Sequence, residues 1–269
     1  MASQDKAPGA PTLTRPVRTW ALVTGATGGI GAEFARHLAT HGCHLVLTGR
    51  NQQKLDELVA ELGDSGAELV PLVVDLSDPA ARTGLHRQLV ERGITVTTLV
   101  NNAGYGILGD VADTDVDRLL GMVEVNVTAL THLTRLFLPA MLEQRQGTII
   151  NVASTASFQA MPGMAAYAAS KAYVRSFSTA LWHEVKGTGV RIVSISPGPT
   201  ESAFFEIAGD DTAMTRRRTP ADVVTTTFDA LQKGRPSVVD GRSNALLACA
   251  NRLVPPTIST VIARRVLNR

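Results

Sequence analysis

The sequence predicts a single doubly wound α/β domain with a seven-stranded parallel sheet and helices on both faces. Seven short runs of the chain are rich in β-branched residues and almost continuously apolar, and longer amphipathic windows separate most of them. Strands of this composition are buried on both faces, as in a parallel sheet that helices cover. The 269 residues contain no internal repeat and no linker between domains, and one large α/β domain accommodates that length.

Strand-like and helical segments follow one another from residue 19 onwards. The expected strands are Trp20–Val23, Leu45–Leu47, Leu69–Val74, Val96–Val100, Thr148–Val152, Val190–Ile195 and Ser237–Val239. The expected helices cover Glu33–Thr40, Gln52–Leu62, Pro79–Arg92, Asp115–Leu142, Ala165–Lys186 and Pro220–Lys233. Residues 1–18 are rich in proline and lack the apolar middle of a signal peptide, so we expect a disordered lead-in there. The domain is expected to end near residue 240, followed by a helical extension over residues 241–269.

The composition excludes several classes of protein. A formal net charge of +2, with 44% hydrophobic and 19% charged residues, is ordinary for a soluble globular protein. No basic stripe interleaves with aromatic residues, so the chain carries no nucleic-acid footprint. No apolar run reaches the roughly 18 residues that a membrane span requires. Cys43 and Cys249 match no metal-binding or redox spacing, so we expect free thiols, no metal site and a cytoplasmic protein.

The first strand leads directly into a glycine-rich turn, which an expected helix follows. Glycines in this setting allow a tight turn and let the backbone approach a pyrophosphate closely, with the first amides of the helix facing the anion. The alternative is an ordinary tight turn, which the position in the first strand–helix unit disfavours. The candidate residues for binding a dinucleotide here are Thr24, Gly25, Thr27, Gly28, Gly29, Ile30 and Gly31.

The end of the second strand bears on which dinucleotide binds. Nineteen positions after Gly31, where an NAD-specific fold places a carboxylate on the ribose 2′-hydroxyl, the chain has Arg50. A carboxylate there would repel a 2′-phosphate, whereas a guanidinium grips it with paired hydrogen bonds. NADP(H) is therefore favoured over NAD(H). The alternative is a solvated arginine at the start of a helix.

Further candidate residues lie where the third and fourth strands end. The carboxylate of Asp75 suits an acceptor for the adenine amino group. The alternative, a helix cap before Pro79, falls more naturally to Ser77 or Asp78. Side-chain amides after the fourth strand can brace loops at the carboxyl edge, where ligands of open sheets bind. The candidates at this edge are Asp75, Leu76, Asn102, Ala103 and Gly104.

An alanine-rich segment that should be helical carries Tyr167 and Lys171 four positions apart, so both side chains project from one face. A free tyrosine titrates near ~10, and a fixed ammonium favours its phenolate. Lowering that pKa to ~7 requires about 4 kcal/mol, which one ammonium at the edge of a closed site could largely supply. Taken alone, the pair is equally explained as an ordinary pair on a helix surface. Asn126, in the long expected helix, is either a kink stabiliser or part of a polar relay.

Together these motifs resemble the short-chain dehydrogenase/reductase family over roughly residues 19 to 240. The matching positions are Thr24 to Gly31, Asp75-Leu76, Asn101 to Gly104, Asn126, Ser154, Tyr167, Lys171 and Pro197-Gly198, with Ser154 13 positions before Tyr167 as in the family. The resemblance implies a Rossmann-fold catalytic domain. In it, Tyr167 is the acid/base, Ser154 orients the carbonyl, and Asn126 holds a water that relays protons to solvent. Lys171 is implied to hold the nicotinamide ribose and to lower the pKa of Tyr167.

The segment after the sixth strand completes the candidate cofactor site with Pro197, Gly198, Thr200 and Ser202. Family members usually carry a threonine near the last position, touching the nicotinamide carboxamide. Here Ser202 occupies that position with Thr200 nearby, so either hydroxyl can make the contact. We expect residues of about 200–218 to form a lid over the substrate.

The resemblance implies an NADP(H)-dependent oxidoreductase that reduces a ketone or aldehyde to an alcohol, or runs the reverse reaction. Apolar residues near the site suggest an apolar carbonyl substrate, such as a 3-oxoacyl thioester, a fatty ketone or a steroid. These residues are Tyr105, Phe158, Met161, Met164, Phe204, Phe205, Ile207 and Met214. The alternative is a sensor or scaffold protein that binds cofactor without turnover, although such a protein has no use for the acid/base set.

Two expectations concern assembly. Family members are often dimers or tetramers through the two long helices, so we expect a homodimer or homotetramer. The segment Arg252–Arg269 has apolar residues at helical spacing and several arginines but no acid, a pattern that could lie on a membrane surface. Packing on its own subunit or on a neighbour is favoured for such a helix.

Overall fold

A computed structural model describes residues 19–201 and 217–251, with residues 254, 255, 257, 259–261 and 264 of the C-terminal segment. The expected lead-in of residues 1–18 therefore lies outside the described residues. The sheet has seven strands in the order β3-β2-β1-β4-β5-β6-β7, and every neighbouring pair is parallel, which confirms the predicted sheet. The strands are β1 (Trp20–Thr24), β2 (His44–Gly49), β3 (Leu69–Val73), β4 (Val96–Asn101), β5 (Gly147–Val152), β6 (Val190–Ser196) and β7 (Ser237–Val239).

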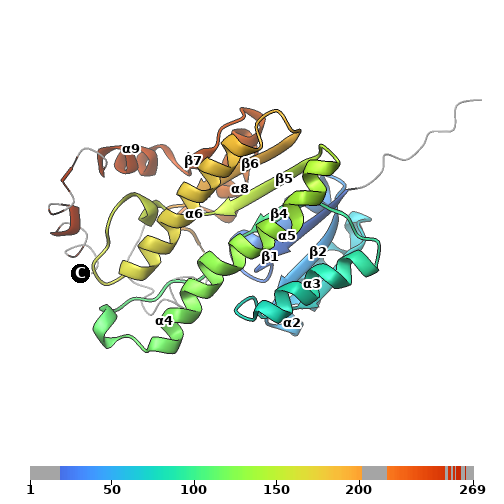
Figure 1. The fold of residues 1–269 in the computed structure, drawn as a ribbon, viewed down its shortest axis with the longest axis horizontal. Coiled ribbons are helices and arrows are strands. Elements are labelled where there is room, and N and C mark those ends of the chain that lie inside the picture. The colour runs from blue at the N-terminus through green and yellow to red at the C-terminus, as the bar shows by residue number, and fades with distance from the viewer. Residues whose placement is uncertain are drawn as a thin grey trace, which may run out of the picture.

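Helices cover both faces of this sheet (Figure 1). They are α1 (Gly29–Thr40), α2 (Gln52–Leu62), α3 (Pro79–Glu91), α4 (Val116–Val123), α5 (Leu130–Glu143), α6 (Ala165–Glu184), α8 (Pro220–Gln232) and α9 (Arg242–Asn251). One apolar core lies between the sheet and α1, α2 and α8, and includes Phe34 and Val223. A second core lies between the sheet and α3, α5 and α6, and includes Leu85 and Phe137. Successive residues of each strand alternate between these cores, which explains why the strands are apolar throughout.

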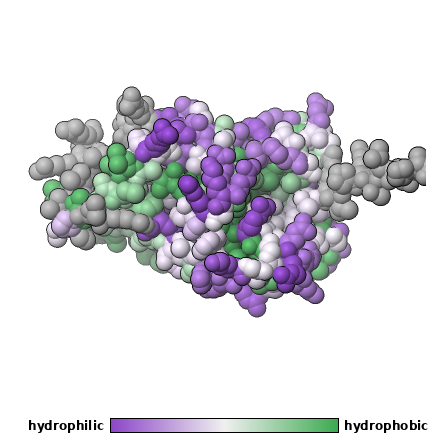
Figure 2. Space-filling view, turned by 90° about the horizontal axis from the view of Figure 1, so that it is seen from above, coloured by the Kyte–Doolittle hydropathy of each residue, from purple (hydrophilic) through white to green (hydrophobic). Residues whose placement is uncertain are grey.

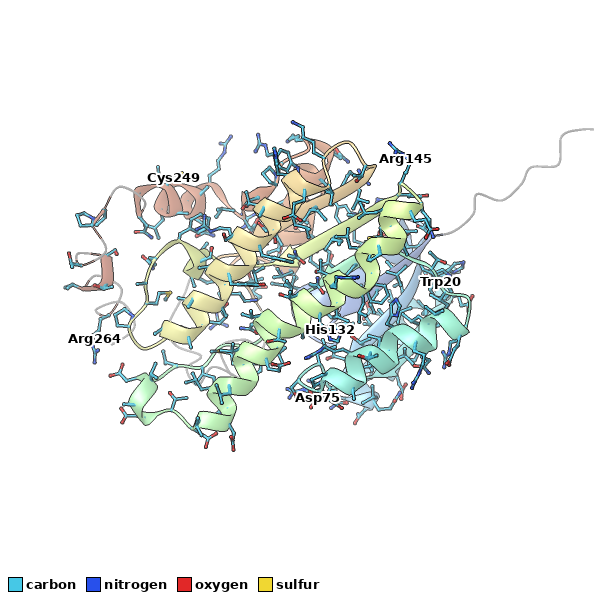
Figure 3. The ribbon with its side chains drawn as sticks, viewed as in Figure 1. Trp20, Asp75, His132, Arg145, Cys249 and Arg264 are labelled. Atoms are coloured by element: carbon cyan, nitrogen blue, oxygen red, sulfur yellow. The ribbon has the colours of Figure 1, made fainter. Side chains whose placement is uncertain are left out.

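The strand order reverses between β1 and β4. Ligands of open α/β sheets bind outside the carboxyl ends of the strands at such a reversal. In Figure 1 these ends point to the left, toward the side where α4 and α9 lie. Figure 3 places Trp20, at the start of β1, at the opposite end of the molecule from Cys249 on α9. The carboxyl edge of the sheet is therefore where a ligand site is expected.

The prediction of one continuous helix over Asp115–Leu142 is wrong, because that helix is interrupted in the structure. A π-helical segment, η3 (Glu124–Ala129), separates α4 from α5. The side chain of Asn126 in this segment accepts a hydrogen bond from the backbone N of Tyr105 at 3.1 Å and donates to the Tyr105 carbonyl at 3.0 Å. It also donates to Ser170 Oγ at 3.1 Å. The extra residue of the π turn thus brings a buried amide against two other elements, a use typical of π-bulges.

A buried arginine ties α3 to the π-helical segment. The side chain of Arg82 is 2% exposed and pairs with Glu124 at 2.8 Å. Its guanidinium also donates to the Leu76 carbonyl at 2.5 Å and to His132 Nδ1 at 3.1 Å. Figure 3 shows His132 on α5, where that helix lies beside α3. Because a buried guanidinium needs every one of these partners, the loop after β3 is held firmly against the layer that carries Asn126.

Two smaller findings complete the fold. Asp78 caps α3 by accepting a hydrogen bond from the backbone N of Ala80 at 2.8 Å, as expected for one of the two alternative capping residues. Among the helices of the described residues, none is long and apolar enough to cross a bilayer.

Candidate active site

A cavity of about 580 Å³ runs along the carboxyl ends of the strands. Its walls are the glycine-rich turn after β1, the ends of β2, β3, β4, β5 and β6, the start of α6 and one face of α9. The volume lies within the range of small-molecule and cofactor sites. Most of the candidate site residues named from the sequence line this one cavity: Gly25, Gly28, Gly29, Ile30, Gly31, Arg50, Asp75, Leu76, Asn102, Ala103, Gly104, Ser154, Tyr167, Lys171, Pro197, Gly198 and Thr200.

The glycine-rich turn is packed so closely that side chains are excluded from it. A Cβ on Gly31 would lie 2.2 Å from the Gly25 carbonyl oxygen and 2.5 Å from Asn102 Nδ2, and Gly25 has φ +62°. The Asn102 amide donates to the carbonyls of Thr24 and Gly25 at 2.9 and 3.1 Å, which joins the end of β4 to the turn. The turn leads directly into the N-terminus of α1. This open backbone cradle fits the pyrophosphate of a dinucleotide.

Two predicted cofactor residues, Thr24 and Thr27, do not line the cavity. Thr24 is 1% exposed, and its hydroxyl donates to the Val100 carbonyl at 3.1 Å. The same oxygen accepts hydrogen bonds from the backbone N of Asn102 and of Ala103, both at 3.0 Å. With these partners on β4 and the loop after it, the Thr24 side chain positions the turn and is not available to a ligand.

Arg50 and Asp75 mark the end of the cavity near β2 and β3. Arg50 is exposed and follows β2 immediately. The carboxylate of Asp75 accepts hydrogen bonds from the backbone N and the hydroxyl of Ser77 at 2.9 and 2.7 Å. These bonds, together with the nearby charge of Arg50, hold the pKa of Asp75 below its usual range. This end of the cavity therefore presents one exposed guanidinium and one carboxylate that stays ionised.

The catalytic candidates meet where β5 ends and α6 begins. Ser154 follows β5, and Tyr167 and Lys171 lie one turn apart on α6, 7% and 5% exposed. The Lys171 ammonium donates to the Val152 carbonyl at 2.8 Å and lies 6.0 Å from the centre of the Tyr167 ring. A Cβ on Gly104 would lie 2.7 Å from Asn126 Oδ1 and 3.2 Å from Lys171 Nζ. All four catalytic candidates are thus brought together, and Gly104 lies between Asn126 and Lys171, where only a glycine fits.

Burial sets the protonation of this group, and in this structure it outweighs the lowering of the Tyr167 pKa that the resemblance implies. Burial raises the pKa of Tyr167 to about 12, and a hydrogen bond with Ser154 offsets only part of that rise. Burial lowers the pKa of Lys171 to about 8. The phenolate is disfavoured because the site is dry, and the ammonium points to a backbone carbonyl. Tyr167 is consequently a protonated donor at neutral pH.

We expect Lys171→Met to stabilise the protein at pH 7 in the absence of added cofactor. Below about pH 8 the folded protein must hold a charged, buried ammonium that the unfolded chain keeps in water, where its pKa is 10.5. This penalty is of order 3 kcal/mol, and it disappears as the pH rises towards 10.5. The substitution also loses the hydrogen bond to the Val152 carbonyl, which reduces the net gain in stability by about 1–2 kcal/mol.

Urea unfolding at pH 7 and at pH 10 measures this effect. The free energy of unfolding of Lys171→Met should exceed that of the wild type by about 1–2 kcal/mol at pH 7, and the gain should vanish at pH 10. Lys186→Met, which removes an exposed lysine just after α6, is the matched control and should change little. A Lys171→Met protein that is less stable than the wild type at pH 7 would contradict this cost of burying the ammonium.

Part of the predicted lid lies outside the described residues, including Ser202, Phe204, Phe205, Ile207 and Met214. The described ends of that segment are joined beside the cavity, because Thr200 and Arg218 form a parallel bridge. The backbone N of Glu201 donates to the Arg218 carbonyl at 2.9 Å, and the backbone N of Arg218 donates to the Pro199 carbonyl at 2.9 Å. Arg218 also pairs with the buried Asp240 at 2.5 Å, which anchors this junction to the end of β7.

The predicted apolar pocket is partly present. Tyr105, Met161 and Met164 line the cavity and pack with the ring of Tyr167 in one apolar cluster. Phe158 does not line it, because its ring faces the guanidinium of Arg175 at 4.4 Å. Helix α9 forms a further wall of the cavity that was not predicted from the sequence, made of Asn244, Leu247, Ala248 and Asn251. These four positions follow helical spacing, but two are asparagines, so no apolar stripe marks them.

Comparisons with known proteins agree with this geometry. The sequence profile of the family described as short chain dehydrogenase matches residues 19–212. The NADP-dependent 3-hydroxy acid dehydrogenase YdfG of Escherichia coli is 37% identical over 194 residues, which cover 71% of this chain and 77% of that protein.

Solved structures with the same fold hold either form of the nicotinamide cofactor. A short-chain dehydrogenase from Sphingobium yanoikuyae in complex with NADPH has a TM-score of 0.79 and 28% identity, covering 87% of this chain and 94% of that one. A Burkholderia phymatum short chain dehydrogenase/reductase in complex with NAD has a TM-score of 0.78 and 27% identity, covering 86% of this chain and 92% of that one. The match of the family profile, the parallel sheet and the glycine cradle agree, so this chain belongs to the short chain dehydrogenase family and is an oxidoreductase that acts between an alcohol and a carbonyl with a nicotinamide cofactor.

Proposed function

We propose that this protein is an NADPH-dependent carbonyl reductase of apolar ketones or aldehydes. The observation that carries the proposal is the meeting of Ser154, Tyr167 and Lys171 at one cavity with the glycine-rich turn. In the proposed site, Tyr167 is the proton donor and Ser154 shares the carbonyl oxygen with it. Lys171 then returns a proton to Tyr167, and Asn126 is proposed to hold a water that relays protons from solvent.

Each residue has a physical reason for its role. The cofactor, when bound, supplies the hydride that reduces the carbonyl carbon. Negative charge then builds on the carbonyl oxygen, and the hydroxyls of Ser154 and Tyr167 donate hydrogen bonds to it. Because burial keeps the pKa of Tyr167 at about 12, the phenol is protonated at neutral pH and has a proton to transfer. Lys171, with its pKa lowered to about 8, can give up a proton near neutral pH to restore the phenol.

The preference for NADP(H) rests on Arg50. Its guanidinium is exposed at the end of β2 and lines the cavity, where it can pair with a 2′-phosphate. The related Escherichia coli enzyme is named NADP-dependent, which supports the proposal, while the Burkholderia phymatum structure holds NAD. Asp75, the nearest carboxylate, is held by Ser77 and is proposed to face the adenine.

The proposal of an apolar substrate rests on the wall beside Tyr167. Met161, Met164 and Tyr105 line the cavity there. The charged side chain near them among the described lining residues, that of Lys171, donates its hydrogen bond to the Val152 carbonyl at 2.8 Å. A substrate with an ionised group next to its carbonyl would lose hydration without gaining a partner. An alkyl or ring substituent instead gains free energy by leaving water.

The test is the consumption of NADPH, followed by absorbance, across ketones, aldehydes and acyl thioesters of different size and charge. We expect turnover with apolar ketones or aldehydes, a weaker response to substrates with a carboxylate beside the carbonyl, and lower kcat/KM with NADH than with NADPH. Binding of NADPH without oxidation by any member of the panel would contradict a reductase and favour a cofactor-binding sensor.

A further inference from the structure

Helix α9 crosses the cavity from the end of β6 to the loop before α6. At its first turn, Asn244 donates to the Asp240 carbonyl at 2.8 Å and lies so close to Gly198 that a Cβ there would be 2.3 Å from its Nδ2. At its last residue, Asn251 Nδ2 donates to Gln159 Oε1 at 2.8 Å. The helix is therefore held at both ends against elements that line the cavity.

The face of α9 between these anchors is apolar, with Ala248 buried and Leu247 largely exposed. Leu247 and Ala248 line the cavity, and Leu247 remains 63% exposed. Figure 2 shows hydrophobic residues gathered at the end of the molecule where α9 lies, whereas much of the rest of this view is hydrophilic. A leucine that lines a cavity and is mostly exposed loses contact with water only when another apolar group enters beside it.

Two other parts of the chain lie next to the C-terminal end of α9 or follow it in sequence. Gln159, which accepts the hydrogen bond from Asn251, lies close in sequence to the lining residues Met161 and Met164. Farther along the chain, Arg264 pairs with Asp110 of the loop after β4 at 3.2 Å. This ion pair joins Arg264 of the C-terminal segment to the loop after β4 of the same subunit.

We propose that Leu247 is a specificity-determining residue, which receives the end of the substrate's apolar chain farthest from the carbonyl. This inference rests on the proposed function, because it assigns a place to the substrate of that same site. Contact with the Leu247 side chain raises kcat/KM for substrates long enough to reach it and leaves kcat/KM for shorter substrates unchanged.

The test compares Leu247→Ala with Leu246→Ala, using butanone and methyl octyl ketone as substrates with NADPH. Leu246 is adjacent and 73% exposed but does not line the cavity, so it is the matched control. For methyl octyl ketone, Leu247→Ala should lower kcat/KM about fivefold to tenfold, the loss of roughly one methyl-sized contact or two. Butanone kcat/KM and the Kd for NADPH should change less than about twofold, and Leu246→Ala should match the wild type.

A second measurement separates this inference from the proposed function. Calorimetric titration of methyl octyl ketone into the protein saturated with NADP+ reports binding without turnover, and Leu247→Ala should weaken it by the same factor. Equal effects of the two alanine variants, or a loss independent of chain length, would overturn the role of Leu247. A wild type that binds the ketone but never reduces it would overturn the reductase proposal alone, and a wild type that does not bind it would overturn the role of Leu247.

Discussion

Tyr167→Phe is expected to lower kcat for carbonyl reduction by roughly 10²- to 10⁴-fold while leaving the Kd for NADPH nearly unchanged. The substitution removes the phenol that we propose as the proton donor, which burial holds protonated at neutral pH. The phenyl ring keeps its packing with Ile107, Met122 and Met164, so the fold should be preserved. Lys171 and Ser154 remain in place, so the loss reports the missing hydroxyl.

Single-turnover absorbance of bound NADPH measures the chemical step, and fluorescence titration measures cofactor affinity. Tyr173→Phe is the control, because Tyr173 lies on the same helix, is 38% exposed and does not line the cavity. Its hydroxyl forms a hydrogen bond with Thr131 at 2.9 Å, and its ring stacks on Phe177. The control should retain wild-type turnover. If Tyr167→Phe reduces ketones as fast as the wild type, Tyr167 is not the proton donor.

Arg50→Asp should change the ratio of the Kd for NADPH to the Kd for NADH by roughly 10²- to 10³-fold in favour of NADH. The change removes the proposed charge-assisted pair with the 2′-phosphate and places a carboxylate where it would repel that phosphate, effects worth about 3–4 kcal/mol together. A carboxylate at this position can also accept a hydrogen bond from the 2′-hydroxyl of NADH. Because Arg50 is exposed, the effect should shrink as the salt concentration rises.

Fluorescence titration with both cofactors at fixed ionic strength measures this ratio. Arg87→Asp makes the same change of charge on the exposed face of α3, outside the cavity, and should leave the ratio unaltered. An unchanged ratio in Arg50→Asp would mean that another residue recognises the phosphate. The two variants together separate a local contact from the net charge of the protein.

Much of the fold could be predicted because a strand that is buried on both faces has an almost continuously apolar sequence. The segment Thr148–Val152 is apolar or β-branched at nearly every position, and all six residues of β5 are buried. The glycine-rich turn was equally readable, since only glycine satisfies the contact at Gly31. The interruption after α4 was not readable, because the π turn depends on the backbone of Tyr105, 21 residues away in the chain.

The sequence by itself determined the glycine-rich turn and the placing of a phenol and an ammonium one helical turn apart, because spacing along a turn or a helix sets relative position. The roles of these groups and of the hydroxyl 13 residues earlier came from the resemblance to the family. The tertiary structure decided three other matters: that Thr24 braces the turn, that burial raises the pKa of Tyr167, and that α9 walls the cavity. Each depends on contacts between distant parts of the chain, such as the bond between Gln159 and Asn251, 92 residues apart, and desolvation arises only when those parts pack together.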